Sequence, residues 1–125
     1  MKILTWEEGH EFRGMGGVMK WIFWPQNGCN QVTLHYAIRQ PGEAMPLHSH
    51  EFSDDIVSII QGRGKVVTDQ GEFDIQAGQS VWVPAKERHG FKNTGDAPLV
   101  TLGSQGPPDP QIYQRAGFRF DIKGR

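Results

Sequence analysis

The sequence predicts an all-β protein that forms one domain and closes as a jelly-roll barrel. Short runs of alternating apolar and polar residues recur between turn signals, and 16 glycines and eight prolines punctuate them. No window of a dozen residues keeps the apolar period of a helix. Eight to ten short strands at close spacing favour two facing sheets, for which a jelly roll is a natural solution.

The first core strand is expected at residues 18–24, where Pro25 ends it. Residues 1–17 precede it as a leader that packs on the outside of the barrel. Asn27-Gly28 then predicts a tight hairpin, because a type I′ turn needs positive φ at both central residues.

The next strand is expected at residues 31–39 and has two different faces. Positions 32, 34, 36 and 38 are apolar, whereas His35 and Arg39 lie with Thr33 and Ala37 on the opposite, more polar face. The remaining strands are expected around the His-Ser-His segment at 48–50 and at residues 55–61, 63–68, 72–76, 80–83, 88–92 and 98–102.

The barrel core therefore spans about residues 18–103 of a single domain covering 1–125. Residues 103–110 are too rich in glycine and proline to form regular structure, and residues 104–125 are a Pro-rich C-terminal extension. Its aromatic side chains are expected to fold back onto the barrel or onto a partner subunit. Exposed β edges and these aromatics predict a homodimer.

Composition excludes several classes of function. Thirteen basic and 14 acidic residues give a net charge of -1 without a block of like charge, so no footprint for nucleic acid or anionic lipid is present. Cys29 is the only cysteine, which rules out an intrachain disulfide and a thiolate zinc cluster. The acidic residues near the start and the lack of a long apolar stretch lead us to expect a soluble, cytoplasmic protein without a membrane partner.

One stretch concentrates residues that bind metals. His48 and His50 are one residue apart, so on a strand both imidazoles share a face. Asp55 opens an apolar run in which it shares a face with Val57 and Ile59, where an unpaired charge is costly. Two imidazoles and a carboxylate suit a divalent metal. The alternative interpretation is a polar edge followed by a turn.

A second stretch, residues 78–93, contains a third histidine, His89. Two hairpins separate it from His50, so a barrel could bring its imidazole back to the first two from a distant strand. Together the two stretches resemble the cupin family, whose motifs run Gly, five residues, His-x-His, three or four residues, an acid, six residues, Gly, and later Gly, five residues, Pro-x-Gly, two residues, His, three residues, Asn. The matching positions are Gly42, His48, His50, Asp55 and Gly62, then Gly78, Pro84, His89 and Asn93. The resemblance covers about residues 30–103.

The resemblance implies a double-stranded β-helix barrel that holds one divalent transition metal (Mn, Fe, Ni, Co or Zn). By resemblance, its ligands are His48, His50, Asp55 and His89. Asp55 stands where the family usually has Glu and is one methylene shorter, so it binds directly or through a water. Glu51 and Asp54 are alternative ligands if the register slips by one, although alternation sends both away from the histidines. Lys86 replaces the second motif's other glycine, at a cost of about 1 kcal/mol if its φ is positive.

Three further residues are candidates for contacting a substrate. His35 is either a donor that orients a metal ligand or a structural hydrogen-bonding group. Arg39 is a candidate anchor for an anionic substrate in the barrel mouth. Phe91 lies two residues after His89, hence on its face, and is expected to line the pocket.

The resemblance implies two classes of function. The first is a metal-dependent enzyme, a dioxygenase or an isomerase or lyase, acting on a small phenolic, keto-acid or sugar-acid metabolite. The alternative is a non-catalytic module that binds a metal and a small ligand. No acid–base catalyst can be named from the sequence, and fold alone does not decide between the reactions.

Overall fold

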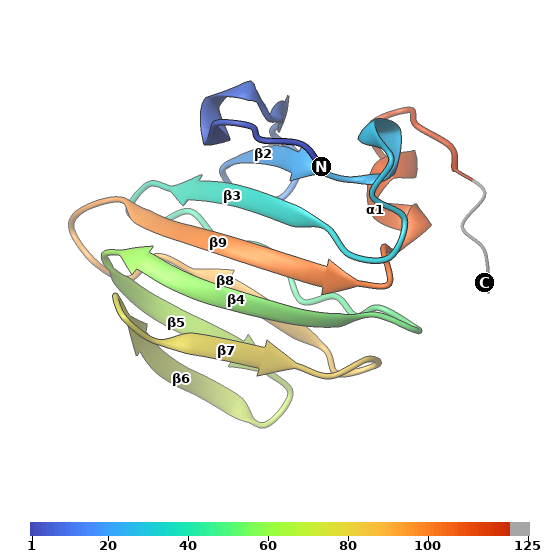
Figure 1. The fold of residues 1–125 in the computed structure, drawn as a ribbon. Helices are drawn as coiled ribbons and strands as arrows, with labels where there is room; N and C mark the ends of the chain where they lie inside the picture. Colours follow the sequence, from blue (N-terminus) through green and yellow to red (C-terminus); the bar gives the residue numbers. More distant parts are fainter. Residues whose placement is uncertain (121–125) are drawn as a thin grey trace.

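The computed structural model describes residues 1–120 and folds them into two facing β-sheets (Figure 1). Its strands are His10–Phe12 (β1), Val18–Phe23 (β2), Leu34–Arg39 (β3), Asp54–Gln61 (β4), Arg63–Thr68 (β5), Gly71–Gln76 (β6), Ser80–Val83 (β7), His89–Lys92 (β8) and Leu99–Gly106 (β9). One sheet has the order β1-β2-β3-β9-β4-β7 and the other the order β6-β5-β8. The chain is all-β, as the sequence predicts, and its strands pair antiparallel.

Strand β4 carries the alternation that the sequence shows. Asp55, Val57 and Ile59 are 7%, 6% and 2% exposed, whereas Ile56 and Ile60 on the other face are 52% and 45% exposed. The strand pairs with β9 on one side and β7 on the other, so its inner face points into the barrel. A carboxylate therefore enters an apolar interior at the start of β4, as expected.

The structure shows which of the two faces of β3 is the inner one. The more polar face is the inner one: Ala37 and Arg39 are 1% and 3% exposed. The face with Tyr36 and Ile38 is turned outward and is half-buried. Trp6, in the short 3₁₀ helix Trp6–Glu8, places its ring 5.2 Å from that of Tyr36. The interior here is a cavity with polar groups, so alternation alone could not tell which face is buried.

The ends of the barrel differ from the expected boundaries. Strand β1 adds part of the leader to the sheet by pairing with β2. Strand β9 continues to Gly106, because its ladder with β4 runs to the pair Asp54–Gly106, so residues 103–106 are regular after all. Pro107, which has no amide hydrogen to donate, follows directly after it. The helix Pro110–Gln114 (α1) comes next. The core is thus wider than 18–103.

The turn after β2 also differs from the expected hairpin. Pro25–Asn27 forms a 3₁₀ turn, and Gly28 with φ 98° ends it in the left-handed region. The side chain of Asn27 accepts a hydrogen bond from the Trp24 amide and donates one to Ile22 O, so it caps its own turn. The β5–β6 and β6–β7 connections fall where the sequence predicts them.

Two clusters of apolar side chains fill the space between and beside the sheets. One contains Val57, Ile59, Val66, Ile75, Phe91 and Leu99 inside the barrel. The other contains Met15, Met19, Trp21, Trp24, Ala37 and Tyr113, and Phe118 and Phe120 pack against it. The C-terminal aromatics thus fold back onto their own chain, while residues 121–125 lie outside the described part. Among residues 1–120, no helix is long and apolar enough to cross a membrane.

Candidate metal centre

The His-Ser-His segment is held by a bridge between backbones and is not the strand we expected. The His48 amide donates to His89 O at 3.0 Å, and the His89 amide donates to His48 O at 2.8 Å. Pro46, which has no amide hydrogen, interrupts any longer ladder. The bridge nevertheless sets these two imidazoles side by side, with ring centroids 4.4 Å apart.

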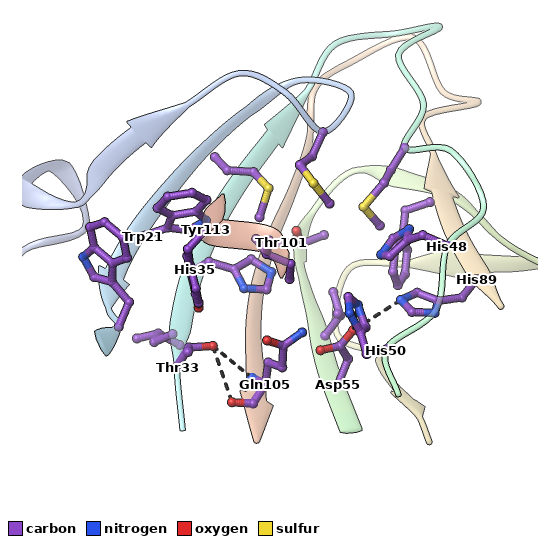
Figure 2. A pocket seen from close by; sticks show the side chains of 18 of the residues that line it. Trp21, Thr33, His35, His48, His50, Asp55, His89, Thr101, Gln105 and Tyr113 are labelled. Atoms are coloured by element: carbon purple, nitrogen blue, oxygen red, sulfur yellow. Dashed lines mark hydrogen bonds and ion pairs between the residues drawn. The ribbon is translucent and has the colours of Figure 1, made fainter. Parts of the chain in front are cut away.

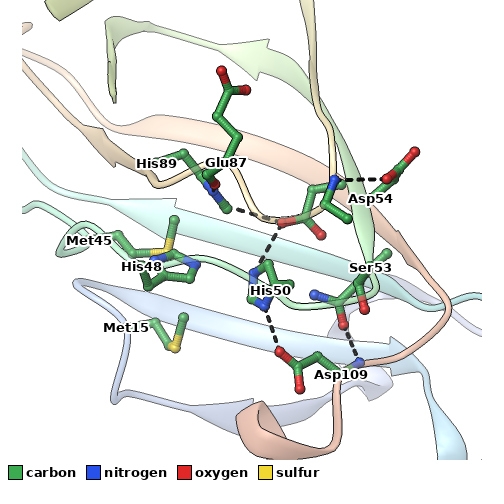
Figure 3. Close-up of polar contacts among 12 residues, drawn as sticks. Met15, Met45, His48, His50, Ser53, Asp54, Glu87, His89 and Asp109 are labelled. Atoms are coloured by element: carbon green, nitrogen blue, oxygen red, sulfur yellow. Dashed lines mark hydrogen bonds and ion pairs between the residues drawn. The ribbon is translucent and has the colours of Figure 1, made fainter. Parts of the chain in front are cut away.

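Three imidazoles meet at this point (Figures 2 and 3). His48, His50 and His89 each offer one ring nitrogen, and these nitrogens all lie within 4.8 Å of one another. His50 and His89 are only 4% and 2% exposed. Side chains that are distant in the sequence thus converge in the interior, as the two motifs predict.

Each imidazole has its Nδ1 atom engaged by an oxygen. His48 Nδ1 lies 2.8 Å from Pro46 O, and His89 Nδ1 lies 2.9 Å from Glu87 O. A carbonyl can only accept, so both Nδ1 atoms carry the hydrogen. His50 Nδ1 lies 2.8 Å from a carboxylate oxygen of Asp109. This arrangement leaves the three Nε2 atoms to bind a cation, which is how proteins orient histidine ligands.

Asp55 stands at the edge of the histidine group. Its Oδ2 lies 3.3 Å from His50 Nε2 and 3.2 Å from His89 Nε2. Two ligands that are each ~2.1 Å from one ion are separated by about 3 Å at ordinary coordination angles. Asp55 thus stands beside two of the histidines, although the group whose ligand atoms all lie within 4.8 Å of one another consists of the three histidines. Asp54 and Glu51, the alternative ligands, are both exposed.

The electrostatics of the site follow from burial and hydrogen bonds. Burial alone would raise the pKa of Asp55, but hydrogen bonds from His50 and His89 hold it well below its usual range. Burial would lower the pKa of His50, but its bonds to Asp109 and Asp55 raise it to about 9. Burial lowers the pKa of His48 to about 4, so this imidazole is neutral at pH 7.

These donors fit a divalent transition metal. Imidazole nitrogens with a carboxylate oxygen form the kind of set that binds Zn, Fe, Mn, Ni or Co in proteins. A bound cation would also compensate the ionised Asp55 in a site from which water is largely excluded. The residues present therefore match the metal that the two motifs predict.

Asp109 is the residue that sequence reasoning missed. It precedes α1, and its side chain accepts a hydrogen bond from the Gln111 amide as an N-cap. The other carboxylate oxygen is the one that meets His50, and the Asp109 amide donates to Gln105 Oε1 at 2.7 Å. The Asp109-Pro110 pair is a helix-start signal. That signal could have placed Asp109 at a helix end, though not beside His50.

The histidines open onto a cavity of about 50 Å³ (Figure 2). The three candidate substrate-contacting residues His35, Arg39 and Phe91 all line it. Burial lowers the pKa of His35 to about 4, so its ring is neutral at pH 7. The other lining side chains are mostly apolar and include Met15, Met19, Met45, Trp21, Trp24, Ile112 and Tyr113.

Comparison with known proteins agrees with this geometry. The model of the cupin domain matches residues 35–103, which include His48, His50, Asp55 and His89. The polyketide synthase protein CurC of Streptomyces cyaneus is 33% identical over 103 residues, covering 80% of this chain and 67% of its own.

Two solved structures share the fold. The polyketide cyclase RemF of Streptomyces resistomycificus superposes with a TM-score of 0.76 at 20% identity, over 88% of this chain and 82% of its own. A predicted oxalate decarboxylase of Thermotoga maritima gives a TM-score of 0.75 at 23% identity, over 86% and 100%. The matched domain, the paired motifs and the barrel together establish that the chain belongs to the cupin family.

Proposed function

We propose that this cupin is a metal-dependent enzyme acting on a small oxygenated metabolite. His48, His50, His89 and Asp55 hold one divalent ion, and an oxygen of the substrate binds beside them. Such an ion acts as a Lewis acid that polarises a bound carbonyl or enol oxygen. The proposal rests above all on the convergence of three imidazoles whose Nδ1 atoms already have oxygen partners.

The chain's own side chains give the substrate its surroundings. Phe91 is 3% exposed and Trp21 is 3% exposed, and both line the cavity together with Tyr113. Such walls exclude water and favour a flat, partly apolar substrate. His35 presents a neutral imidazole to the same space, and its ring makes no hydrogen bond to another described residue. It is therefore suited to hydrogen-bond a substrate hydroxyl or carbonyl.

Within the two reaction classes, a phenolic or keto-acid substrate has more support than a sugar acid. The aromatic and methionine-rich wall suits an apolar ring better than a polyhydroxylated chain. Two similar proteins, CurC and RemF, are named for polyketide chemistry. We infer carbonyl or enol chemistry of the isomerase or lyase type as the first candidate, and ring dioxygenation as the second.

Metal analysis tests the centre. Protein purified without added metal is expected to contain about one equivalent of a divalent transition metal, and His50→Ala is expected to lose it. His10→Ala is the matched control, because His10 is exposed and packs among the aromatic side chains beside β2. Unchanged metal content in His50→Ala, measured by mass spectrometry of the elements, would contradict the ligand set.

Activity assays then distinguish the reaction classes. Oxygen uptake over a panel of phenolic and keto-acid substrates supports a dioxygenase if the metal is iron or manganese. Substrate loss without oxygen uptake supports an isomerase or lyase. The non-catalytic alternative is favoured by the small cavity volume, about 50 Å³, which holds only a few water molecules. Binding without turnover across the panel would favour that alternative.

A further inference from the structure

A guanidinium group is buried at the C-terminal end of β3. Arg39 is only 3% exposed. Its Nη2 donates to Met15 O at 3.1 Å and contacts the thioether of Met45 at 3.6 Å. Its Nε is the one buried side-chain nitrogen or oxygen in residues 1–120 without a hydrogen-bond partner. A buried cation is thus held by one carbonyl and one weak acceptor.

No carboxylate of the described chain pairs with this guanidinium. The ion pairs among residues 1–120 do not include Arg39. Against the lowering by burial, the carboxylate of Glu43 raises the pKa of Arg39 through space, but it lies beyond ion-pair distance. Leaving a buried charge unpaired is costly, and proteins normally pair such a group. We therefore take the partner of this guanidinium to be a bound ligand and not a residue of the described chain.

The guanidinium also lies on the cavity that contains the histidines. Arg39, Met45 and His48 all line this cavity. Met45 also packs against both apolar clusters. Figure 3 shows Met15 and Met45 on the side of the site where His48 lies. Methionine side chains are unbranched and adaptable, and Met45 is only half-buried. A thioether is a weak acceptor that an oxyanion can replace.

We propose that Arg39 binds the anionic group of the substrate, which is a small organic anion with a carboxylate or enolate oxygen. The anion displaces the Met45 thioether and takes the vacant Nε donor together with an adjacent Nη donor. Arginine presents these donors in a planar fork that matches a carboxylate. This inference deepens the proposed function by adding a negative charge to the substrate, yet the anion site itself needs no metal.

The test compares ligands that differ only in charge. The full chain, both as purified and after treatment with a chelator, is titrated with pyruvate and with the neutral pyruvamide. Binding is followed by tryptophan fluorescence, since Trp21 and Trp24 line the cavity, and by calorimetry. We expect pyruvate to bind at least tenfold more tightly than pyruvamide in both preparations. Acetylacetone near its pKa serves as the enolate probe and separates the two sources of charge.

Variants assign the preference to Arg39. Arg39→Met should lose the preference, and Arg39→Lys should keep part of it. Arg88→Met is the control, because Arg88 is exposed and pairs with Asp69 at 2.9 Å. Met45→Glu adds a carboxylate beside an intact Arg39 and should also abolish the preference for pyruvate. This second variant keeps the inference testable if Arg39→Met does not fold.

Two outcomes would overturn the inference. One is equal binding of pyruvate and pyruvamide by the wild-type chain. The other is a preference that persists in folded Arg39→Met or in Met45→Glu, since the charge would then be recognised by the histidines. A chain that contains no metal as purified, yet still prefers pyruvate, would contradict the proposed function while supporting the anion site.

Discussion

Asp109 connects the histidine cluster to a part of the chain that lies beyond the matched cupin residues 35–103. Its carboxylate meets His50 Nδ1 at 2.8 Å and also caps α1, and it is 8% exposed. A carboxylate behind a histidine ligand fixes the orientation of the ring and raises its basicity. The position of one candidate metal ligand therefore depends on the start of the C-terminal helix.

We predict that Asp109→Asn weakens metal binding about 10–100-fold, the usual effect of losing such a partner. Competition with a chromophoric chelator measures the affinity. Asp54→Asn is the control, because Asp54 lies on the outer face and bonds Trp82 Nε1 and the Ala85 amide. Equal losses in both variants, or none in Asp109→Asn, would show that Asp109 does not orient His50.

His35 gives a pH dependence with a defined sign. Burial, the dominant influence, lowers its pKa from 6.5 to about 4, against the attraction of Asp55. Between these values the unfolded chain binds a proton that the folded chain refuses. The contribution of His35 to stability is thus complete above pH 6.5 and is lost as the pH falls toward 4.

We therefore expect the metal-free wild type to lose up to about 3 kcal/mol more unfolding free energy between pH 6.5 and 4 than His35→Gln. Urea denaturation at several pH values gives the two curves. His48 has its pKa lowered in the same direction, but it is present in both proteins and cancels in the difference. Parallel curves would mean that His35 titrates normally.

At the scale of elements, the turn before β8 carries a strained residue. Lys86 has φ 75°, a left-handed conformation that glycine adopts without strain, and its amide donates to His50 O at 2.7 Å. The backbone bond ties this turn to the His-Ser-His segment. The strain anticipated from the motif is thus located in a turn that supports the metal centre.

Lys86→Gly is predicted to stabilise the protein by about 1 kcal/mol, because relief of strain outweighs the added entropy of the unfolded chain. Gly78→Ala is the reciprocal variant: Gly78 has φ 93°, and a Cβ added there would meet no other residue's atom within 4 Å beyond its chain neighbours, so only conformational strain opposes a methyl group. It should destabilise by about the same amount. Midpoints of urea denaturation measure both, and effects of equal sign would contradict this account.

The sequence predicted the strands best where alternation continued into the apolar interior. Strand β4 is the clear example, since Asp55 and Ile59 share a buried face as expected. It could not tell which face of β3 is buried, because a cavity makes the more polar face the inner one. It also failed at β9, because glycine and proline content concealed a strand that its ladder with β4 extends to Gly106. Pairing across the sheet outweighs local propensity there.

For the candidate site, motif spacing identified the side chains that converge on the candidate metal centre, because each motif lies in one short stretch of chain. Asp109 could not be found in this way. Its contact with His50 depends on how the chain after β9 packs against the barrel, which has no pattern in the local sequence. Long-range contacts of this kind set the orientation of ligands that spacing alone can only name.

At the scale of the whole molecule, the aromatic residues of the C-terminal segment are already occupied within the chain. Tyr113 packs edge-on against Trp21 at 4.9 Å, and Phe118 against Trp24 at 5.0 Å. They therefore no longer argue for a partner subunit. What remains is the outer face of the six-stranded sheet, where Ile56 lies opposite Trp82 in register and both are more than half exposed.

The homodimer expected from the sequence stays a prediction, and this face is where we expect a second copy to pack. Ile60 extends the apolar strip along β4, and the strip ends at β7, an unpaired sheet edge. A two-fold axis would pair such a strip with itself and would cover Trp82. Light scattering at micromolar concentration should give about twice the monomer mass of 14.1 kDa.

Trp82→Glu should reduce the measured mass to that of one copy, because the dimer contact would then bury two carboxylates. Phe73→Glu, at a position on β6 of the other sheet that is also more than half exposed, should leave the mass unchanged. A wild-type monomer would rule the dimer out, and dissociation by Phe73→Glu alone would move the contact to the opposite sheet.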